Sequence, residues 1–354
     1  MNVVHFLWAL NQGGAENLAI DLANEQARDH HVALVVGNDS VSPSVKRRLD
    51  PAVRYQCIGR PTGSRNPYWV ASLLWALNRL RPDVIHSHTR DLAALGRLIF
   101  RPMILTVHSV NMDFSPAVSR YNALCCISES VFLDVRQRCP ARKLHRIDNG
   151  VVIPRIAPSP DRAPSALLRA VQVSRLAHEI KGQDLLIRAL AAMSGRCPVP
   201  RMTVDFVGEG PSLHYLRDLA VEVGVGAQCR FLGALSREEV YARLGDYDLL
   251  VQPSRREGFG LTVVEGMAAG IPVLVSNIEG PMEIIGNGEF GHSFDSGDAE
   301  ALAIALEVLA AEIRCGSARQ RTIAARRHVE ETYSLQRMAA EYDAIYRDVA
   351  ERRP

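Results

Sequence analysis

Two glutamates, Glu257 and Glu265, stand eight positions apart in the stretch REGFGLTVVEGMAAGIPVL. Gly258 and Gly260 follow the first acid, and an apolar helical pattern begins at Leu261. Glycines leave backbone amides accessible, and amides at a helix start bind phosphate. Ionised carboxylates only accept hydrogen bonds, so hydroxyl-rich ligands suit them. The pattern therefore predicts a sugar at one acid and a ribose at the other, bridged by a diphosphate at the amides.

A second pattern, SRLAHEIKGQDLL, supplies positive charge. Arg175 ends a predicted strand, and Lys181 stands directly before a glycine and a new helix. Two cations at a strand end and a helix start suit a diphosphate, by charge and by donated hydrogen bonds. Solvated surface cations are the plainer interpretation of the same two residues.

A third pattern, NQGGAEN, follows the first predicted strand and opens a helix. Gly13 and Gly14 there would let the backbone approach an anion, although an ordinary strand-to-helix turn explains the glycine pair about as well. His86 and His88 end another strand, and we expect them to form strand-end hydrogen bonds rather than acceptor contacts.

Short apolar strands alternate with amphipathic helices along the chain. This alternation is typical of an α/β fold in which helices cover both faces of a parallel sheet. The expected strands are Val3–Trp8, His31–Val36, one that ends in PDVIHSH (Pro82–His88), Met103–His108, Ala123–Ser128, Ala170–Arg175, Thr203–Gly208, Cys229–Gly233, Asp248–Ser254 and Pro272–Ser276. The expected helices are Ala15–Arg28, Trp69–Leu80, Gln183–Met193, Leu213–Val223, Glu238–Leu244 and Leu261–Ala269.

The length of 354 residues favours two domains. A proline- and serine-rich segment, Pro154–Ser165, reads as the linker between them. We therefore expect an N-terminal Rossmann-like domain over 1–160 and a C-terminal one over 165–334, with a cleft between the carboxyl ends of the two sheets. The apolar stripe of Trp69–Leu80, with Trp75, is expected to lie in the core.

Charge is distributed unevenly, although the net charge is only +2. Residues 1–165 carry 20 Lys/Arg and 13 Asp/Glu, a balance of +7, and the remaining residues carry 21 and 26, a balance of −5. The basic half could face anionic lipid or a charged acceptor, or its arginines could simply be scattered over the surface. The candidate basic residues are Lys46, Arg47, Arg48, Arg54, Arg60 and Arg65. Nothing in this balance favours a nucleic-acid partner.

Seven cysteines without a C-x-x-C spacing indicate a reducing compartment and no zinc site. No signal-peptide pattern and no apolar run of about 18–20 residues is present, which predicts a cytoplasmic protein or one that lies on the inner face of the cell membrane. The DYD triplet at Asp246–Asp248 imitates a metal-binding motif but begins a strand, so a structural role is preferred.

The setting PS-x-x-EGFG-x-x-x-x-EGMA-x-G-x-PV around Glu257 and Glu265 resembles the retaining GT-B glycosyltransferases of family 4, also called group 1. Further matching segments are NQGGAE, TVHS, NGV (Asn149–Val151), R-x5-KG, VGEGP, FLG and the segment before QPS. The tail AAEYDAIYRDV resembles the last helix of that family, which packs back on the first domain, and this implies a helix over about 335–354 that belongs there.

The resemblance implies a role for each matching residue. Arg175 and Lys181 would neutralise the donor diphosphate and stabilise the leaving nucleoside diphosphate. Glu257 would bind hydroxyls of the donor sugar, Glu265 those of the ribose, and His108 would reach the donor sugar or the transition state. The remaining donor-binding residues would be Gly13, Gly14, Phe259, Gly260, Leu261 and Thr262. The resemblance implies catalytic roles for Glu257, His108, Arg175 and Lys181.

The family implies a UDP- or GDP-linked sugar donor and transfer with retention, in which the departing phosphate oxygen takes the acceptor proton. No metal or other cofactor is expected. The acceptor would be a glycan, such as a lipid-linked oligosaccharide, lipopolysaccharide or another cell-surface polysaccharide precursor. The stretch EGPME departs from the family, because Glu279 stands where a glycine is common, and this puts donor-sugar contacts near Glu279 in doubt.

Two other functions fit the same residues. One is a nucleotide-sugar epimerase or hydrolase of the same fold, and the other is a non-catalytic protein that binds a nucleotide sugar. Product analysis with and without an acceptor would separate the first from a transferase. The presence of Glu257, Arg175, Lys181 and His108 argues against the second.

Overall fold

The structure is a computed structural model that describes residues 1–11, 13–139, 143–153, 165–196 and 202–351. The predicted linker, apart from its last residue Ser165, lies outside these residues. The chain divides into two compact units: a first unit of Met1–Val152 with Tyr333–Pro354, and a second unit of Ile153–Thr332. Each unit is described separately below.

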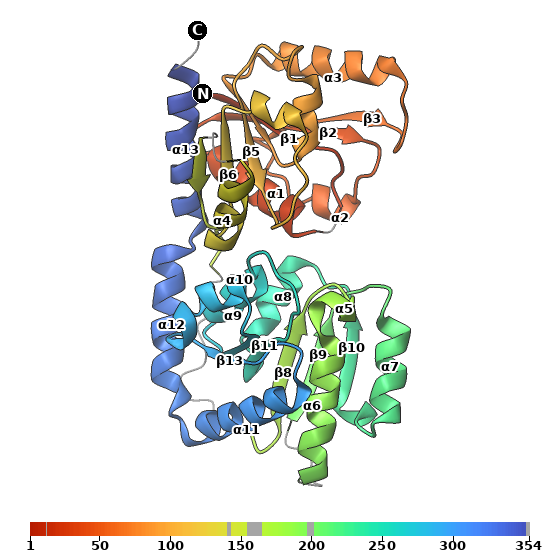
Figure 1. Cartoon of the computed structure of the whole chain (residues 1–354), viewed down its shortest axis with the longest axis vertical. Helices are drawn as coiled ribbons and strands as arrows, with labels where there is room; N and C mark the ends of the chain where they lie inside the picture. The colour runs from red at the N-terminus through yellow and green to blue at the C-terminus, as the bar shows by residue number, and fades with distance from the viewer. Residues whose placement is uncertain (12, 140–142, 154–164, 197–201, 352–354) are drawn as a thin grey trace. The chain divides into compact units, whose positions relative to one another are not determined.

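The first unit is built on a seven-stranded parallel sheet in the order β3-β2-β1-β4-β5-β6-β7 (Figure 1). Its central strands are continuously buried, as expected for a sheet that is covered on both faces. The strands are β1 Asn2–Leu7, β2 His31–Asn38, β3 Arg54–Arg60, β4 Val84–Ser87, β5 Met103–Val107, β6 Ala123–Cys126 and β7 Leu144–Arg146.

The helices of the first unit include one that comes from the end of the chain. They are α1 Gly14–Gln26, α2 Pro43–Lys46, α3 Pro67–Leu80, α4 Glu129–Arg138 and α13 Leu335–Glu351, with 3-10 turns at Arg90–Leu95 and Pro116–Arg120. Leu18 and Leu22 of α1 share one apolar core with Met338, Tyr342 and other residues of α13. Helix α13 therefore forms part of this unit (dark blue in Figure 1).

The second unit holds a six-stranded parallel sheet in the order β10-β9-β8-β11-β12-β13. Its strands are β8 Leu168–Val173, β9 Met202–Val207, β10 Cys229–Gly233, β11 Leu249–Gln252, β12 Val273–Ser276 and β13 His292–Phe294. Its helices are α5 His178–Lys181, α6 Gln183–Arg196, α7 Leu213–Glu222, α8 Arg237–Leu244, α9 Leu261–Ala268, α10 Glu279–Ile284, α11 Ala299–Cys315 and α12 Ala318–Thr332, with 3-10 turns at Gly226–Gln228 and Gly286–Gly288.

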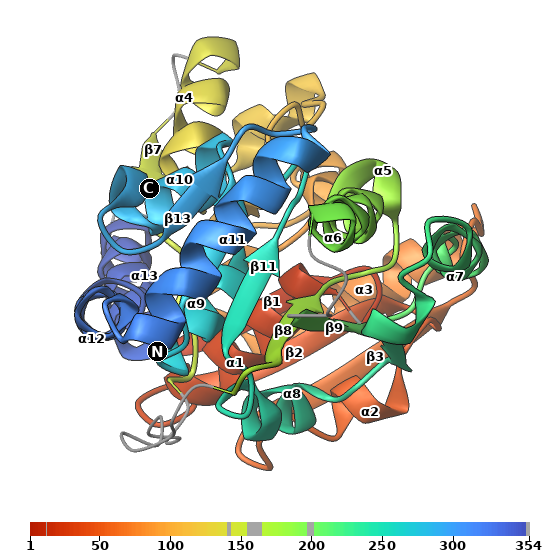
Figure 2. The same cartoon turned by 90° about the horizontal axis from the view of Figure 1, so that it is seen from below.

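One face of this second sheet is covered by α6, α7 and α11. Leu186, Leu190, Leu219 and Leu306 from these helices belong to one buried cluster with strand residues such as Phe206. Helices α6 and α11 lie side by side across this face (Figure 2).

The strand order of each sheet determines where a ligand can bind. In both sheets the order reverses between the first strand and its later neighbour, β1 and β4 in the first unit and β8 and β11 in the second. Ligands of doubly wound sheets bind outside the carboxyl ends of the strands at such a reversal. The segments after β1, β4, β8 and β11 are therefore the first places to look for a site.

The expected α/β architecture of two Rossmann-like domains is confirmed. Strands β3, β7 and β13 were not predicted from the sequence, because their segments RYQCIGR, LHR and HSF lack a continuous apolar run. The expectation that Trp75 lies in the core is wrong. Helix α3 buries Leu73, Ala76 and Leu77, whereas the Trp75 side chain on its other side is 58% exposed.

None of the helices in the described part of the chain combines the length and the apolarity that crossing a lipid bilayer requires.

Asp205 of β9 is a buried carboxylate whose partners tie three strands of the second unit together. It accepts two hydrogen bonds of 2.6 Å from Arg230 on β10 and one of 2.8 Å from the hydroxyl of Tyr247, just before β11. We expect Asp205→Ala to lower the free energy of unfolding by about 2 kcal/mol, because it leaves both donors unpaired. Urea denaturation measures the change.

Glu307→Ala is the matched control for this prediction, since it removes an exposed ion pair with Arg196 in the same unit. Exposed pairs contribute little, so the control should change stability by less than about 0.5 kcal/mol. Equal effects of the two substitutions would contradict the assigned role of Asp205.

Candidate functional site

The loop after β11 places Glu257 against Lys181. The Nζ atom of Lys181 lies 2.6 Å from Oε2 of Glu257, and both side chains are mostly buried. The same oxygen lies 3.3 Å from Nε2 of Gln252 and 3.4 Å from the hydroxyl of Ser254. Three donors thus converge on one carboxylate oxygen at the carboxyl end of β11.

Backbone contacts fix the position of Lys181. The short helix α5 ends at Gly182, which adopts a left-handed conformation with φ of 65°. Nε2 of Gln172, on β8, donates to the carbonyl of Lys181 at 2.8 Å. A Cβ atom on Gly182 would lie 1.9 Å from the carbonyl oxygen of Pro253, so only glycine permits this close approach.

A second ion pair joins the same two segments. Arg255 donates two hydrogen bonds to the carboxylate of Asp184, at 2.7 and 2.8 Å, and a third to the carbonyl of His178 at 2.7 Å. A bidentate arginine–carboxylate pair holds its partners in one geometry. The loop after β11 is therefore attached to α5 and α6 on both sides of Lys181.

Helix α9 starts at this loop. Gly260 is its N-cap with φ of 117°, and the first backbone N–H groups of the helix have no carbonyl partner within it. The hydroxyl of Thr262 donates to Oε1 of Gln252 at 3.3 Å, which links the helix start to the carboxylate cluster. Phe259 is buried, and its backbone lies 2.7–3.1 Å from where a Cβ atom on Gly280 would stand. The glycine of EGPME thus permits close packing of α10 against this loop.

Glu265 lies on the buried side of α9, and its carboxylate has partners on α8. Its Oε1 accepts from the hydroxyl of Tyr241 at 2.9 Å and lies 3.1 Å from Arg237. Nε of Arg237 also donates to the Tyr241 hydroxyl at 2.7 Å. Arg237 and Tyr241 were not predicted as site residues, because the segment SREEVYARL has the pattern of an N-capped surface helix.

Arg175 lies two residues after the end of β8 and is exposed. Its side chain has no hydrogen bond or ion pair with the residues that the structure describes, while its carbonyl accepts from Nε2 of Gln183 at 2.9 Å. The backbone is therefore held in place, and the guanidinium remains accessible at the carboxyl end of the strand.

The second unit brings together most of the residues that the sequence analysis singled out there. Lys181, Glu257 and Thr262 belong to one hydrogen-bonded group through Gln252, which the sequence analysis did not name. The contact between Lys181 and Glu257 was not expected either. A diphosphate at Lys181 would compete with the Glu257 carboxylate for the same ammonium group.

In the first unit, Gly13 and Gly14 lie at the start of α1, after β1. A Cβ atom on Gly13 would stand 2.2 Å from Oε2 of Glu16, so the carboxylate folds back over the glycine. Burial raises the pKa of Glu16. His108 follows β5, and burial lowers its pKa to about 4, so its imidazole is neutral at pH 7.

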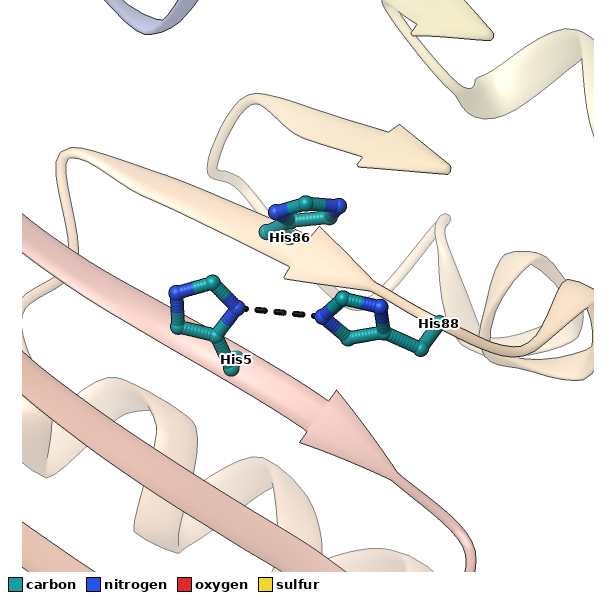
Figure 3. Close-up of side chains that lie close together, drawn as sticks. All are labelled: His5, His86 and His88. Atoms are coloured by element: carbon teal, nitrogen blue, oxygen red, sulfur yellow. Dashed lines mark hydrogen bonds between the residues drawn. The ribbon is translucent and has the colours of Figure 1, made fainter. Parts of the chain in front are cut away.

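Three buried histidines, His5, His86 and His88, lie close together in the first unit (Figure 3), and the His88 ring packs against that of His108. His5 of β1 and His86 of β4 occupy paired positions of adjacent strands, and His88 comes two residues later. Their nearest ring nitrogens lie within 4.8 Å of one another, which is a candidate metal cluster that the sequence spacing did not suggest. Both nitrogens of His86 are already hydrogen-bonded, to Tyr346 at 2.7 Å and Thr106 at 2.6 Å.

Comparison with known proteins agrees with this architecture. Residues 12–155 match the family model Glycosyltransferase Family 4, and residues 162–328 match Glycosyl transferases group 1. The solved structure of Anabaena HepE in complex with UDP and glucose superposes with a TM-score of 0.80, at 19% sequence identity, over 98% of this chain and 99% of that one. The two parallel-sheet domains therefore have the GT-B fold. The chain belongs to the GT-B glycosyltransferases of group 1 and family 4.

Two curated relatives show how far the similarity extends. The glycogen synthase of Mycobacterium tuberculosis is 32% identical over 272 residues, which are 68% of this chain and 64% of the relative. A GDP-mannose-dependent alpha-(1-6)-phosphatidylinositol monomannoside mannosyltransferase of Mycolicibacterium smegmatis is 32% identical over 194 residues, 51% of this chain and 50% of the relative. The chain thus matches between half and two thirds of the length of these relatives.

The close approach of Gly182 to the carbonyl of Pro253 predicts that a larger residue at position 182 destabilises the protein. Gly182→Ala combines a left-handed backbone with a clash against a carbonyl oxygen, so it should lower the free energy of unfolding by at least about 2 kcal/mol. Thermal or urea denaturation measures this. Gly195→Ala in α6 is the control, because a Cβ atom there meets open space and alanine favours a helix. A Gly182 variant as stable as the control would show that the close approach is absent.

The buried histidines predict a pH dependence of stability. Burial lowers the pKa of His5 and His108 to about 4, while the unfolded chain has histidine pKa values near 6.5. Between these values only the unfolded state takes up the protons. Stability should therefore be full above pH 6.5 and fall toward pH 4, by about 1.4 kcal/mol per pH unit for each such histidine.

Urea denaturation at pH 7.5 and 5.5 tests this prediction. His5→Gln should reduce the difference between the two pH values, whereas replacement of the exposed His214 by glutamine should not. Equal stability of the wild-type chain at both pH values would contradict the prediction.

Proposed function

We propose that this chain is a retaining glycosyltransferase that transfers a sugar from a nucleotide-diphospho-sugar donor to a glycan acceptor. The observation that carries the proposal is the group formed by Lys181, Glu257, Gln252 and Thr262 at the carboxyl end of β11. It combines a cation, a carboxylate and the start of a helix at a sheet's strand-order reversal, which suits a donor with a phosphate and a polyol.

In this proposal Lys181 and the exposed Arg175 neutralise the diphosphate, and the N–H groups at the start of α9 donate to it. Once Lys181 turns to the phosphate, Glu257 can accept hydrogen bonds from sugar hydroxyls. Glu265 binds the ribose hydroxyls from its place beside Arg237. Phe259, Gly260, Leu261 and Thr262 provide the remaining contacts.

The roles of the first unit are part of the same proposal. Gly13 and Gly14 lie at a helix start, where backbone N–H groups can donate to an anion. The neutral imidazole of His108 serves the donor sugar. Reaction with retention, the departing phosphate oxygen taking the acceptor proton, requires no metal and no base from the protein.

The identity of the donor and acceptor is proposed from relatives. HepE was solved with UDP and glucose, and the mycobacterial mannosyltransferase is named for GDP-mannose, so we propose a UDP- or GDP-linked hexose. The acceptor we propose is a lipid-linked, lipopolysaccharide or other cell-surface polysaccharide precursor. Exposed Tyr68 and Trp75 on α3 would support contact with an anionic membrane from the cytoplasmic side.

A melting-temperature panel with UDP, GDP, UDP-glucose and GDP-mannose tests the donor. We expect one nucleotide and its sugar to raise the melting temperature by mass action. Glu257→Ala should keep the nucleotide shift, because Lys181 loses a competitor for phosphate, and should lower transfer or donor hydrolysis at least about 100-fold. Glu265→Gln should weaken nucleotide binding about tenfold with less effect on turnover.

Glu222→Ala, which removes an exposed carboxylate of α7, is the control and should behave as the wild-type chain does. No shift with any of the four compounds would overturn the proposed function. Unchanged turnover in Glu257→Ala would remove that residue from the mechanism. Products formed equally with and without a glycan acceptor would indicate an epimerase or hydrolase instead.

A further inference from the structure

A chain of hydrogen bonds in the first unit runs from α13 to the carboxyl end of β4. Asp343 of α13 accepts at Oδ1 from Nε2 of Gln26, at 2.8 Å. A carboxylate can only accept, so the amino group of the Gln26 amide must face Asp343. Its carbonyl oxygen Oε1 then faces Nε2 of His5, at 2.9 Å. The donor and acceptor at each step can thus be assigned by chemistry alone.

The chain of hydrogen bonds continues through His5 and His88. Burial lowers the pKa of His5 to about 4 and that of His88 well below its usual value, so both rings are neutral and each has one donor and one acceptor. His5 must donate from Nε2 to the Gln26 oxygen, which leaves its Nδ1 as an acceptor. Nε2 of His88, 3.1 Å from that atom, must therefore donate (Figure 3). The remaining nitrogen of His88, Nδ1, carries a lone pair.

This Nδ1 atom of His88 is buried and has no hydrogen-bond partner among the described residues. The side chain is only 6% exposed. The centroid of its ring lies 5.7 Å from that of the His108 ring, and the two rings are stacked. Nε2 of His108 is also buried and has no hydrogen-bond partner among the described residues. Both histidines directly follow strand ends next to the strand-order reversal. An unpaired buried acceptor costs free energy that a ligand hydroxyl would recover.

A metal ion bound by His5, His86 and His88 is the competing explanation for this cluster. Both nitrogens of His86 and both of His5 already have hydrogen-bond partners, so an ion would have to break bonds with Thr106, Tyr346 or Gln26. The four ring nitrogens of His5 and His86 thus all have partners without an ion. The geometry therefore favours the tautomer chain, by which we mean Asp343, Gln26, His5 and His88 in this order.

We propose that Asp343, acting through the tautomer chain, keeps Nδ1 of His88 unprotonated so that it accepts a hydrogen bond from a hydroxyl group of the sugar that is transferred. Asp343 is then a positioning residue, since it acts through others, and His88 is a binding residue. The proposal rests on the proposed function as far as the sugar is concerned. The assignment of the tautomers does not depend on it.

Nitrogen-15 NMR of the full chain with labelled histidine tests the tautomers directly. Signals of His5 and His88 are assigned by their loss in His5→Gln and His88→Gln. We expect a protonated Nε2 and an unprotonated Nδ1 in both rings at pH 7.5. Gln26→Met should produce a mixture of tautomers, because His5 loses the acceptor that selects one. Asp348→Asn, which removes a different carboxylate of α13, is the control and should change nothing.

A protonated Nδ1 on His88 in the wild-type chain would overturn the proposal. So would tautomers that stay unmixed in Gln26→Met. Zn²⁺ added in a stoichiometric amount is a further test. If the ring-nitrogen signals of His5 and His88 are lost and the protein retains one bound ion, the proposal is overturned in favour of the metal site.

A pair of substitutions at His88 separates hydroxyl binding from a structural role. His88→Asn places an amide oxygen near the position of Nδ1 but loses the bond to His5. His88→Gln retains a group near Nε2 for that bond but loses the acceptor. We expect His88→Gln to lower kcat/KM for hydrolysis of UDP-glucose or GDP-mannose about tenfold, and His88→Asn to retain more activity. A purely structural role predicts the reverse order, which would overturn the proposal.

The failure of the proposed function gives a different result. If the wild-type chain binds and turns over neither donor, the transferase proposal fails, whereas the NMR experiment still decides the tautomers. Asp343→Leu removes the acceptor of the Gln26 amino group, whereas Asp348→Leu is the matched control. If the chain is active and both variants leave kcat/KM unchanged, Asp343 is no positioning residue.

Discussion

Buried hydrogen-bonding groups need partners, and the first unit meets this requirement with a helix from elsewhere in the chain. Strands β1, β4 and β5 carry His5, His86 and Thr106 into the buried interior, where leaving these side chains unpaired would cost free energy. Helix α13 brings Tyr342, Asp343 and Tyr346 to them. The hydroxyl groups contact Thr106 and His86, and the carboxylate contacts Gln26. The apolar contacts of α13 with α1 and the polar contacts of its tyrosines therefore fix the same helix position.

In the second unit, charged side chains are held at the carboxyl end of a strand by contacts with one another and with a neighbouring amide. Lys181 and Glu257 neutralise each other there, and Gln252 stands between the acid and the start of α9. The arrangement depends on backbone approach as much as on charge, since Gly182 lies against the carbonyl of Pro253. A flexible lysine beside a fixed loop can change partners without a change in fold.

The sequence predicted the architecture well because the decisive signals are local. A continuous apolar strand such as Val3–Trp8 or a helical stripe can be recognised within ten residues. The choice of Lys181 and Glu257 as candidate site residues also followed from local patterns. Their contact did not, because they are 76 positions apart and meet only through the parallel register of β8 and β11.

The residues that the sequence analysis missed have no local signal. His5 is a single polar residue in an apolar strand segment. Its place in the histidine cluster depends on the register of β1 and β4, which pairs it with His86. Arg237 lies in a segment whose capping box explains it fully as a surface helix. Trp75 was misplaced because an apolar stripe can be wider than the face that α3 buries.

The discontinuity of the first unit has a consequence for synthesis. Its sheet strands precede residue 153, but α13 follows residue 332, so the whole of the second unit is made between them. During translation, the second unit can collapse and fold around its own sheet while the first still lacks the helix that covers its polar strand ends. For about 180 residues of elongation the first unit must persist as an incomplete intermediate with this surface uncovered. Chaperone capture in this interval would be expected to concentrate on the first unit.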